Sequence, residues 1–151
     1  MSKTNNLIGS FLNILNDSSV ITKPSTGYVG SLFFGPNQDV TFRNMAPKGQ
    51  LVPDESFNNE KSFGIPASRT KHHNFHIDFY TYNDFLTDSG LKNVELLNHY
   101  NDLIEDAVFG NRFGNYTVEY VGVEIPPQIA PEVGNNVWMT RQLIVIKERR
   151  R

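Results

Sequence analysis

Residues 71–82, KHHNFHIDFYTY, hold three of the chain's four histidines in a segment that alternates between apolar and polar side chains. Such alternation is typical of a half-buried β-strand, because successive side chains point to opposite faces. One face comprises His73, Phe75, Ile77 and Phe79. The other comprises His72, Asn74, His76, Asp78, Tyr80 and Tyr82. The stretch therefore predicts a strand with one face in the core and one wetter face.

The density of histidines raises the question of a metal site. His72 and His76 share the wetter face, but a rise of about 3.3 Å per residue puts their α-carbons roughly 13 Å apart. One zinc ion, with bonds of about 2 Å, does not easily bridge that separation. His76 and Asp78 lie closer, yet a third ligand would have to come from a distant segment, and His99 lies in a predicted helix. We expect no bound metal and interpret His76 and Asp78 as a candidate pH-sensitive pair.

The clearest helix runs from Asn93 to Phe109, with Gly110 as its C-terminal stop. Its predicted inward face is apolar and comprises Val94, Leu97, Tyr100, Ile104, Ala107 and Val108. Its predicted outer face is polar and acidic and comprises Glu95, Asn98, Asn101, Asp102, Glu105 and Asp106. An earlier helix is predicted from Leu7, Ile8, Phe11, Leu12 and Leu15, which recur at helical spacing. We expect both amphipathic helices to pack on a sheet.

Several further segments predict strands. Two short ones are YVGSLFF (28–34) and DVTFR (39–43), and two longer ones are YTVEYVGVEI (116–125) and VWMTRQLIVIKE (137–148). The connector PPQIAPEVGNN (126–136) contains three prolines, which exclude a helix, and its length predicts a protruding hairpin loop. The order of elements predicts one α+β domain over residues 1–151. We expect a largely antiparallel sheet of four to five strands, packed with two helices.

Residues 44–71 show neither helical nor strand periodicity, although they lie between predicted strands. The segment nevertheless carries the apolar residues Leu51, Val52, Phe57, Phe63 and Ile65. A structureless stretch of this length is typically a functional arm or a disordered segment. Because a loop that contacts only solvent rarely contains so many apolar groups, we expect an extended arm. It would pack against a neighbouring molecule rather than in the core of its own subunit.

Composition and motifs argue against an enzyme and against a membrane protein. The chain has no cysteine, which excludes disulfides, thiolate metal sites and cysteine nucleophiles. The patterns GYVG and GNRFG lack the spacing and lysine of a phosphate-binding loop, and there is no nucleophile elbow. No apolar run reaches the roughly 18 residues of a membrane span, and the N-terminal segment lacks the features of a signal peptide. We expect no catalytic residue, no cofactor, no membrane partner and synthesis in the cytoplasm.

The residues leave two other functions open. A small enzyme would use His76, Asp78 and Glu119. A module for single-stranded nucleic acid would stack bases on Tyr80 and Tyr82, although a net charge of −2 is unusual for such a module. The C-terminal sequence KERRR (147–151) is the sole basic cluster, and it is either a solvated tail or a contact for an acidic partner or a phosphate backbone.

The order of elements resembles that of the tail terminator, or tail-completion, proteins of long-tailed bacteriophages. FHIDFYTYN (75–83) is similar to the central strand of that family, and NVELLNHYNDLIEDAVFGN (93–111) is similar to the helix that follows. YTVEYVGVEIPP (116–127) and NVWMTRQLIVIKE (136–148) resemble its closing hairpin. The first helix and VTFRNMAPKGQLVP (40–53) resemble its start, whereas the arm and the 126–136 loop are long for a minimal member. The likeness lies mainly in residues 71–148 and is one of element pattern.

The resemblance implies a structural protein of the virion tail or neck that forms a homo-oligomeric ring, a hexamer in that family. Such a ring caps the tail tube, so that its partners are the tail tube protein and the head–tail connector or a head-completion protein. Phage DNA would make a passing contact in its lumen. Another neck or head-completion protein is the alternative, because those proteins share similar small folds. The residues expected at interfaces are Leu51, Val52, Phe57, Phe63, Ile65, Ile129, Arg149, Arg150 and Arg151.

Overall fold

The computed structural model describes residues 3–36, 47–59, 69–130 and 136–150. Its elements are, in chain order, α1 (Lys3–Leu15), β1 (Phe33–Phe34), β2 (Lys48–Asn59), β3 (Arg69–Tyr82), α2 (Asn93–Val108), β4 (Arg112–Phe113), β5 (Tyr116–Ile129) and β6 (Val137–Arg150). The strands form one sheet in the order β1-β2-β3-β6-β5-β4. β1 pairs with β2 in parallel, and the other pairs are antiparallel. The predicted α+β class, with a largely antiparallel sheet and two helices, is confirmed, but the sheet has six strands rather than the four to five that were predicted.

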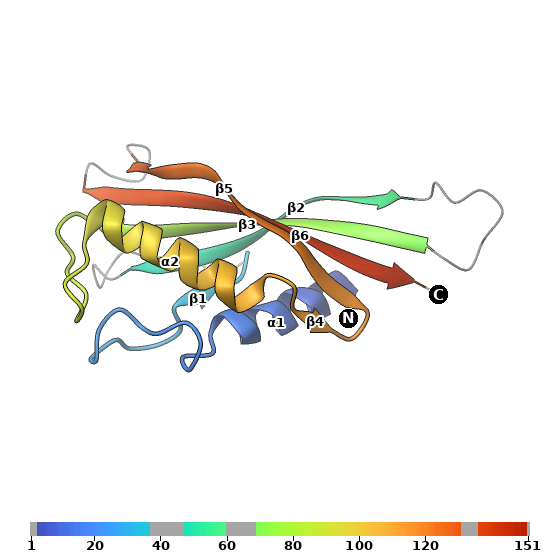
Figure 1. Ribbon diagram of the computed structural model, residues 1–151, viewed down its shortest axis with the longest axis horizontal. Helices are drawn as coiled ribbons and strands as arrows, with labels where there is room; N and C mark the ends of the chain where they lie inside the picture. The colour runs from blue at the N-terminus through green and yellow to red at the C-terminus, as the bar shows by residue number, and fades with distance from the viewer. Residues whose placement is uncertain (1–2, 37–46, 60–68, 131–135, 151) are drawn as a thin grey trace.

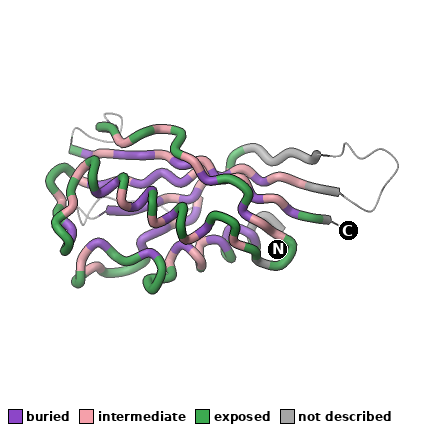
Figure 2. The backbone as a smooth tube through the Cα atoms, viewed as in Figure 1, coloured by how far each residue is buried: buried purple, intermediate pink, exposed green. Residues whose placement is uncertain are grey.

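Both helices lie on the same side of the sheet, and α2 packs on β3, β5 and β6 (Figure 1). The predicted core face of β3 is confirmed, since His73, Phe75, Ile77 and Phe79 are all buried. Figure 2 shows buried positions recurring along the strands, while the turns between elements are mostly exposed. None of the helices in the described part of the chain is long and apolar enough to cross a membrane.

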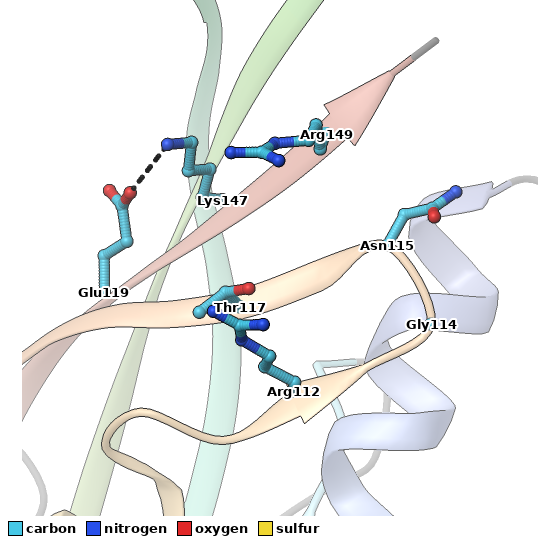
Figure 3. A pocket seen from close by; sticks show the side chains of 7 residues that line it. All are labelled: Arg112, Gly114, Asn115, Thr117, Glu119, Lys147 and Arg149. Atoms are coloured by element: carbon cyan, nitrogen blue, oxygen red, sulfur yellow. Dashed lines mark ion pairs between the residues drawn. The ribbon is translucent and has the colours of Figure 1, made fainter.

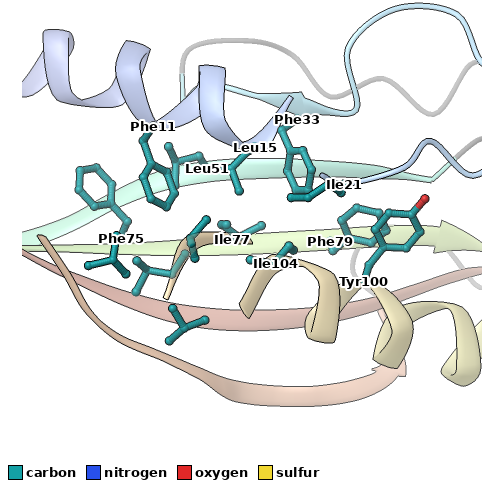
Figure 4. Packing of buried hydrophobic residues seen from close by; sticks show 14 of the residues in the cluster. Phe11, Leu15, Ile21, Phe33, Leu51, Phe75, Ile77, Phe79, Tyr100 and Ile104 are labelled. Atoms are coloured by element: carbon teal, nitrogen blue, oxygen red, sulfur yellow. The ribbon is translucent and has the colours of Figure 1, made fainter. Parts of the chain in front are cut away.

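Aromatic rings join the helices to the sheet in the core (Figure 4). Phe79 of β3 stacks on Tyr100 of α2, with ring centroids 4.6 Å apart, and lies 5.8 Å from the ring of Phe33. Phe11 of α1 stacks on Phe75 of β3 at 6.4 Å. The Tyr100 hydroxyl donates a hydrogen bond of 2.6 Å to a backbone carbonyl, so that its polar end is satisfied although the ring is buried. Both predicted helices therefore contribute to one core.

The buried face of α2 differs from the prediction at three positions, one of which is Leu96, fully buried although it was assigned to neither face. Val94 is 38% exposed, because the centre of the buried stripe lies nearer Tyr100 and Ile104 than the sequence pattern suggested. Asn101, predicted to face solvent, is buried. Its amide nitrogen donates a hydrogen bond of 3.0 Å to the Thr140 hydroxyl, which donates in turn to the Ile125 carbonyl, so that a buried polar contact joins the helix to the sheet.

The predicted arm is wrong over residues 48–59, which form the strand β2. Leu51 is fully buried in the core, so the prediction that it lies at an interface is also wrong (Figure 4). The strand period was hidden because Gly49 carries no side chain and because the pairing register shifts between Pro53 and Ser56. Proline at a bulge is compatible with a strand even though it interrupts the apolar alternation. Residues 44–46 and 60–68 of the arm lie outside the described residues, and residues 69–71 belong to β3.

Two other segments were predicted incompletely. Of YVGSLFF only Phe33–Phe34 is a strand, because Gly30 adopts a φ of 87° that breaks an extended chain. DVTFR lies outside the described residues. The connector after residue 125 is shorter than predicted, since β5 continues through Pro126 and Pro127 to Ile129. The prolines fit there because the register of β5 on β6 shifts between Ile125 and Gln128.

Gly49→Ala is expected to destabilise the fold by about 1–3 kcal/mol, which is typical of overpacking a core. A β-carbon at this position would lie 2.6 Å from the Phe33 ring and 3.0 Å from the Phe79 ring. The free energy of unfolding from denaturant titration is the measurement. Gly9→Ala is the control, because no atom lies within 4 Å of a β-carbon added there. An unchanged stability for Gly49→Ala would contradict the close packing of β1 on β2.

Candidate functional site

The sheet face opposite the helices carries most of the polar groups of the strands, and it is called the open face below. As the alternation of β3 predicted, it holds His72, His76 and Asp78. Strand pairing sets His72 beside Lys147 and Asp78 beside Arg141 of β6. In the part of the chain that is described, both helices pack on the other face (Figure 1). The open face therefore carries charged side chains whose neighbours are set by strand pairing.

A charge network connects three strands of the open face. His76 contacts Asp54 of β2 through Nδ1 at 2.7 Å and Asp78 through Nε2 at 3.6 Å. Arg141 donates two hydrogen bonds to the two carboxylate oxygens of Asp78, at 2.6 and 3.0 Å. These bonds favour the charged guanidinium and raise the pKa of Arg141 above its ordinary value. The predicted pairing of His76 with Asp78 is confirmed, and the arrangement ties β2, β3 and β6 together.

The three residues of the enzyme hypothesis are not brought together. Glu119 pairs with His72 at 3.2 Å and with Lys147 at 3.4 Å, rather than with His76. Both carboxylate oxygens of Asp78 accept hydrogen bonds from Arg141. The carboxylate is therefore already engaged, whereas a general base needs an oxygen that can accept a proton from a substrate. Within the described residues, no group of three or more histidines and carboxylates could hold a metal ion. The contacts of the network join β2, β3 and β6.

Arg141→Gln is expected to lower the free energy of unfolding by about 1–3 kcal/mol, because it leaves the buried Asp78 carboxylate without its bidentate partner. The matched control is Lys147→Gln on the same strand. Lys147 pairs with a partly exposed Glu119, and pairs of that kind contribute at most about 1 kcal/mol. Denaturant titration of the two variants checks the difference. Equal losses would mean that Asp78 does not depend on Arg141.

A second polar site is a cleft at one end of the sheet, called the basic cleft below (Figure 3). It has a volume of about 370 Å³ and is lined by Arg112, Gly114, Asn115, Thr117, Glu119, Lys147 and Arg149. Three of these side chains are cationic and one is a carboxylate. Glu119 partly neutralises Lys147, but no ion pair with another described residue involves Arg112 or Arg149. The cleft therefore presents net positive charge to an incoming anion.

The β4–β5 hairpin shapes the basic cleft. Gly114 and Asn115 connect Phe113 to its pairing partner Tyr116, and Gly114 has a φ of 61°. A two-residue hairpin turn of this kind needs positive φ at its first position, which glycine adopts without strain. The turn pairs Arg112 with Thr117 and so brings it to β5, the neighbour of β6. The backbone N–H of Arg149 donates to the Asn115 carbonyl at 3.0 Å and closes the end of the cleft.

The other end of the open face is apolar. Ala130, Val137 and Met139 are buried in a small cluster, and the partly buried Tyr80, Tyr82 and Ile125 pack against it. Tyr80 and Tyr82 therefore contribute to packing, which leaves less of each ring available for base stacking than the nucleic-acid hypothesis requires. Sequence analysis placed both tyrosines on the correct face but could not identify the residues from β5 and β6 that contact them.

The predicted interface residues are dispersed. Val52 is half-buried on β2 opposite His76, and Ile129 is 47% exposed at the end of β5. Arg149 lines the basic cleft. Phe57 and Arg150 lie in β2 and β6, and Phe63, Ile65 and Arg151 lie outside the described residues. The predicted interface list did not include Arg112, which the β4–β5 turn brings to the cleft, or Lys147, which belongs to the predicted basic cluster KERRR (147–151).

No protein-family model matches the chain. No curated protein sequence matches it either.

Proposed function

We propose that this chain is a structural virion protein of a tailed phage, a ring-forming tail terminator that caps the tail tube and joins it to the head–neck connector. The observation that carries the proposal is the one-sided sheet. Two helices cover one face, while the described helices leave the other uncovered. The arrangement of β3, α2, β5 and β6 also agrees with the element pattern that resembles the tail terminator family.

The open face has the mixed chemistry of a contact between subunits. Leu143 and Val145 of β6 are half-buried there, and the Tyr120 side chain is 51% exposed. The tyrosine lies over Gly122, where a β-carbon would meet its hydroxyl. Apolar surface beside ion pairs is typical of faces that a protein partner covers. The proposal assigns that partner as a neighbouring copy or a ring of the tube.

The test is whether the protein caps tubes. Purified protein would be added to the cognate tail tube protein during polymerisation, and the products imaged by electron microscopy. We expect shorter tubes that carry a ring of extra density at one end. Unchanged tube lengths with bare ends would contradict the proposal.

A matched pair of variants locates the contact. Tyr120→Glu places a charge on the open face and is expected to abolish capping. Phe109→Glu changes an aromatic side chain that is 60% exposed at the end of α2, and it is expected to leave capping intact. Circular dichroism would establish that both variants fold. Equal capping by both would exclude the open face as the surface that binds the tube.

A further inference from the structure

We infer that the basic cleft binds the acidic outer face of α2 from a second copy of this chain. Each subunit would then contact the next head to tail. The inference rests on the proposed function, because a ring of identical subunits needs such a repeating contact.

The basic cleft has the chemistry to bind carboxylates. Arg112 and Arg149 each present a guanidinium, whose planar set of donors matches a carboxylate with two parallel hydrogen bonds. Lys147 adds a third cation, held in place by its 3.4 Å contact with Glu119. None of the described residues that line the cleft has an aromatic or large aliphatic side chain, so the cleft suits charged groups better than an apolar ligand.

The outer face of α2 supplies a matching row of carboxylates. Residues three or four apart on a helix are neighbours on its surface. That spacing aligns the exposed residues Glu95, Asn98, Asp102, Glu105 and Asp106. No ion pair joins the four carboxylates of this row to another described residue. The acidic row therefore retains its charge for an intermolecular contact.

The positions of the two surfaces favour a head-to-tail contact. The basic cleft is built by β4, β5 and β6, whereas the acidic row lies on α2, which packs with its other side on the sheet. Because the two surfaces lie on different elements, each subunit would offer one surface to each of its two neighbours. Contacts of this kind generate a closed ring when the rotation between subunits closes.

A nucleic-acid backbone is the other anion that a basic cleft could bind. The chain is acidic overall, with a net charge of −2, and the exposed row on α2 would repel a polyanion. Binding along a nucleic acid also needs an extended basic surface, whereas the described cations of the cleft are confined to one end of the sheet. Complementarity within the chain therefore favours a second copy.

The experiment is a charge exchange between two variants of the full chain. The first, Arg112→Glu with Arg149→Glu, makes the cleft acidic. The second, Asp102→Lys with Asp106→Lys, makes the helix row basic. Each variant alone would set like charges against each other, and we expect each to need at least a tenfold higher concentration to assemble at low salt. Mixed in equal amounts, they should assemble within about threefold of the wild-type concentration, because every contact again joins opposite charges.

Light scattering and electron imaging would follow assembly, and circular dichroism would establish that each variant folds. Lys23→Glu is the control for added negative charge, since Lys23 lies neither in the basic cleft nor on α2. Variants that assemble like the wild type would overturn the inference and leave the proposed ring intact. Recovery on mixing into open chains rather than rings would support the inference and count against the proposed function. Duplex DNA binding that is lost in the cleft variant, with assembly unaffected, would assign the cleft to nucleic acid and overturn the inference.

Discussion

Replacing Phe79 with alanine is expected to lower the free energy of unfolding by about 3–5 kcal/mol. The ring is fully buried and links three elements, because it stacks on Tyr100 of α2 and contacts Phe33 of β1. Without the ring, the folded state loses the favourable free energy of burying an aromatic side chain. It also loses the packing contacts that the neighbouring side chains make with the ring. The loss is measured by denaturant titration, in which the slope should remain that of the wild type.

Phe109→Ala is the matched control, because this phenylalanine is 60% exposed just after α2. We expect a loss below about 1 kcal/mol, as for most surface substitutions. If Phe79→Ala were equally mild, α2 would not pack on β3 through this ring, and the assigned core would be wrong.

His73→Leu is expected to lower the free energy of unfolding by about 3–5 kcal/mol, as much as Phe79→Ala does. His73 Nε2 lies 3.1 Å from Glu148 Oε1, and both residues are buried on the helix side of the sheet. Removal of the imidazole would leave the carboxylate buried without this partner, which is the costly outcome for a buried pair. Denaturant titration at neutral pH gives the loss.

The double variant His73→Leu with Glu148→Leu distinguishes this cause from a loss of packing. Replacing both partners of a buried pair by apolar groups is often nearly neutral, so the double variant should recover most of the lost stability. A double variant as unstable as the sum of the two single variants would mean that the pair does not act as a unit.

Local periodicity predicted the elements that have a regular pattern. The alternation in 71–82 predicted β3 and its buried face, and helical spacing predicted α2 to within a residue at its C-terminal end. The same reasoning failed for β2, where Gly49 fits beneath an aromatic ring and Pro53 precedes a register shift. Only tertiary contacts make those residues compatible with a strand.

The candidate sites could be predicted only in part, because they depend on pairing between distant segments. The sequence identified His76 with Asp78 but not Arg141, which strand pairing brings from 63 residues away. It identified Arg149 as one basic residue of the C-terminal cluster. It could not identify Arg112, whose position beside β5 is set by a two-residue turn. The missing information is the register of β6 against β3 for Arg141 and the pairing of β4 with β5 for Arg112.

The central claim is that the chain assembles into a ring that closes on itself. Native mass spectrometry of the purified full chain, combined with electron imaging of the same sample, tests it most directly. The account predicts a discrete oligomer of identical subunits, a hexamer by the resemblance, seen as a ring with a central opening. A monomer at every concentration, or an open filament without closed rings, would contradict it.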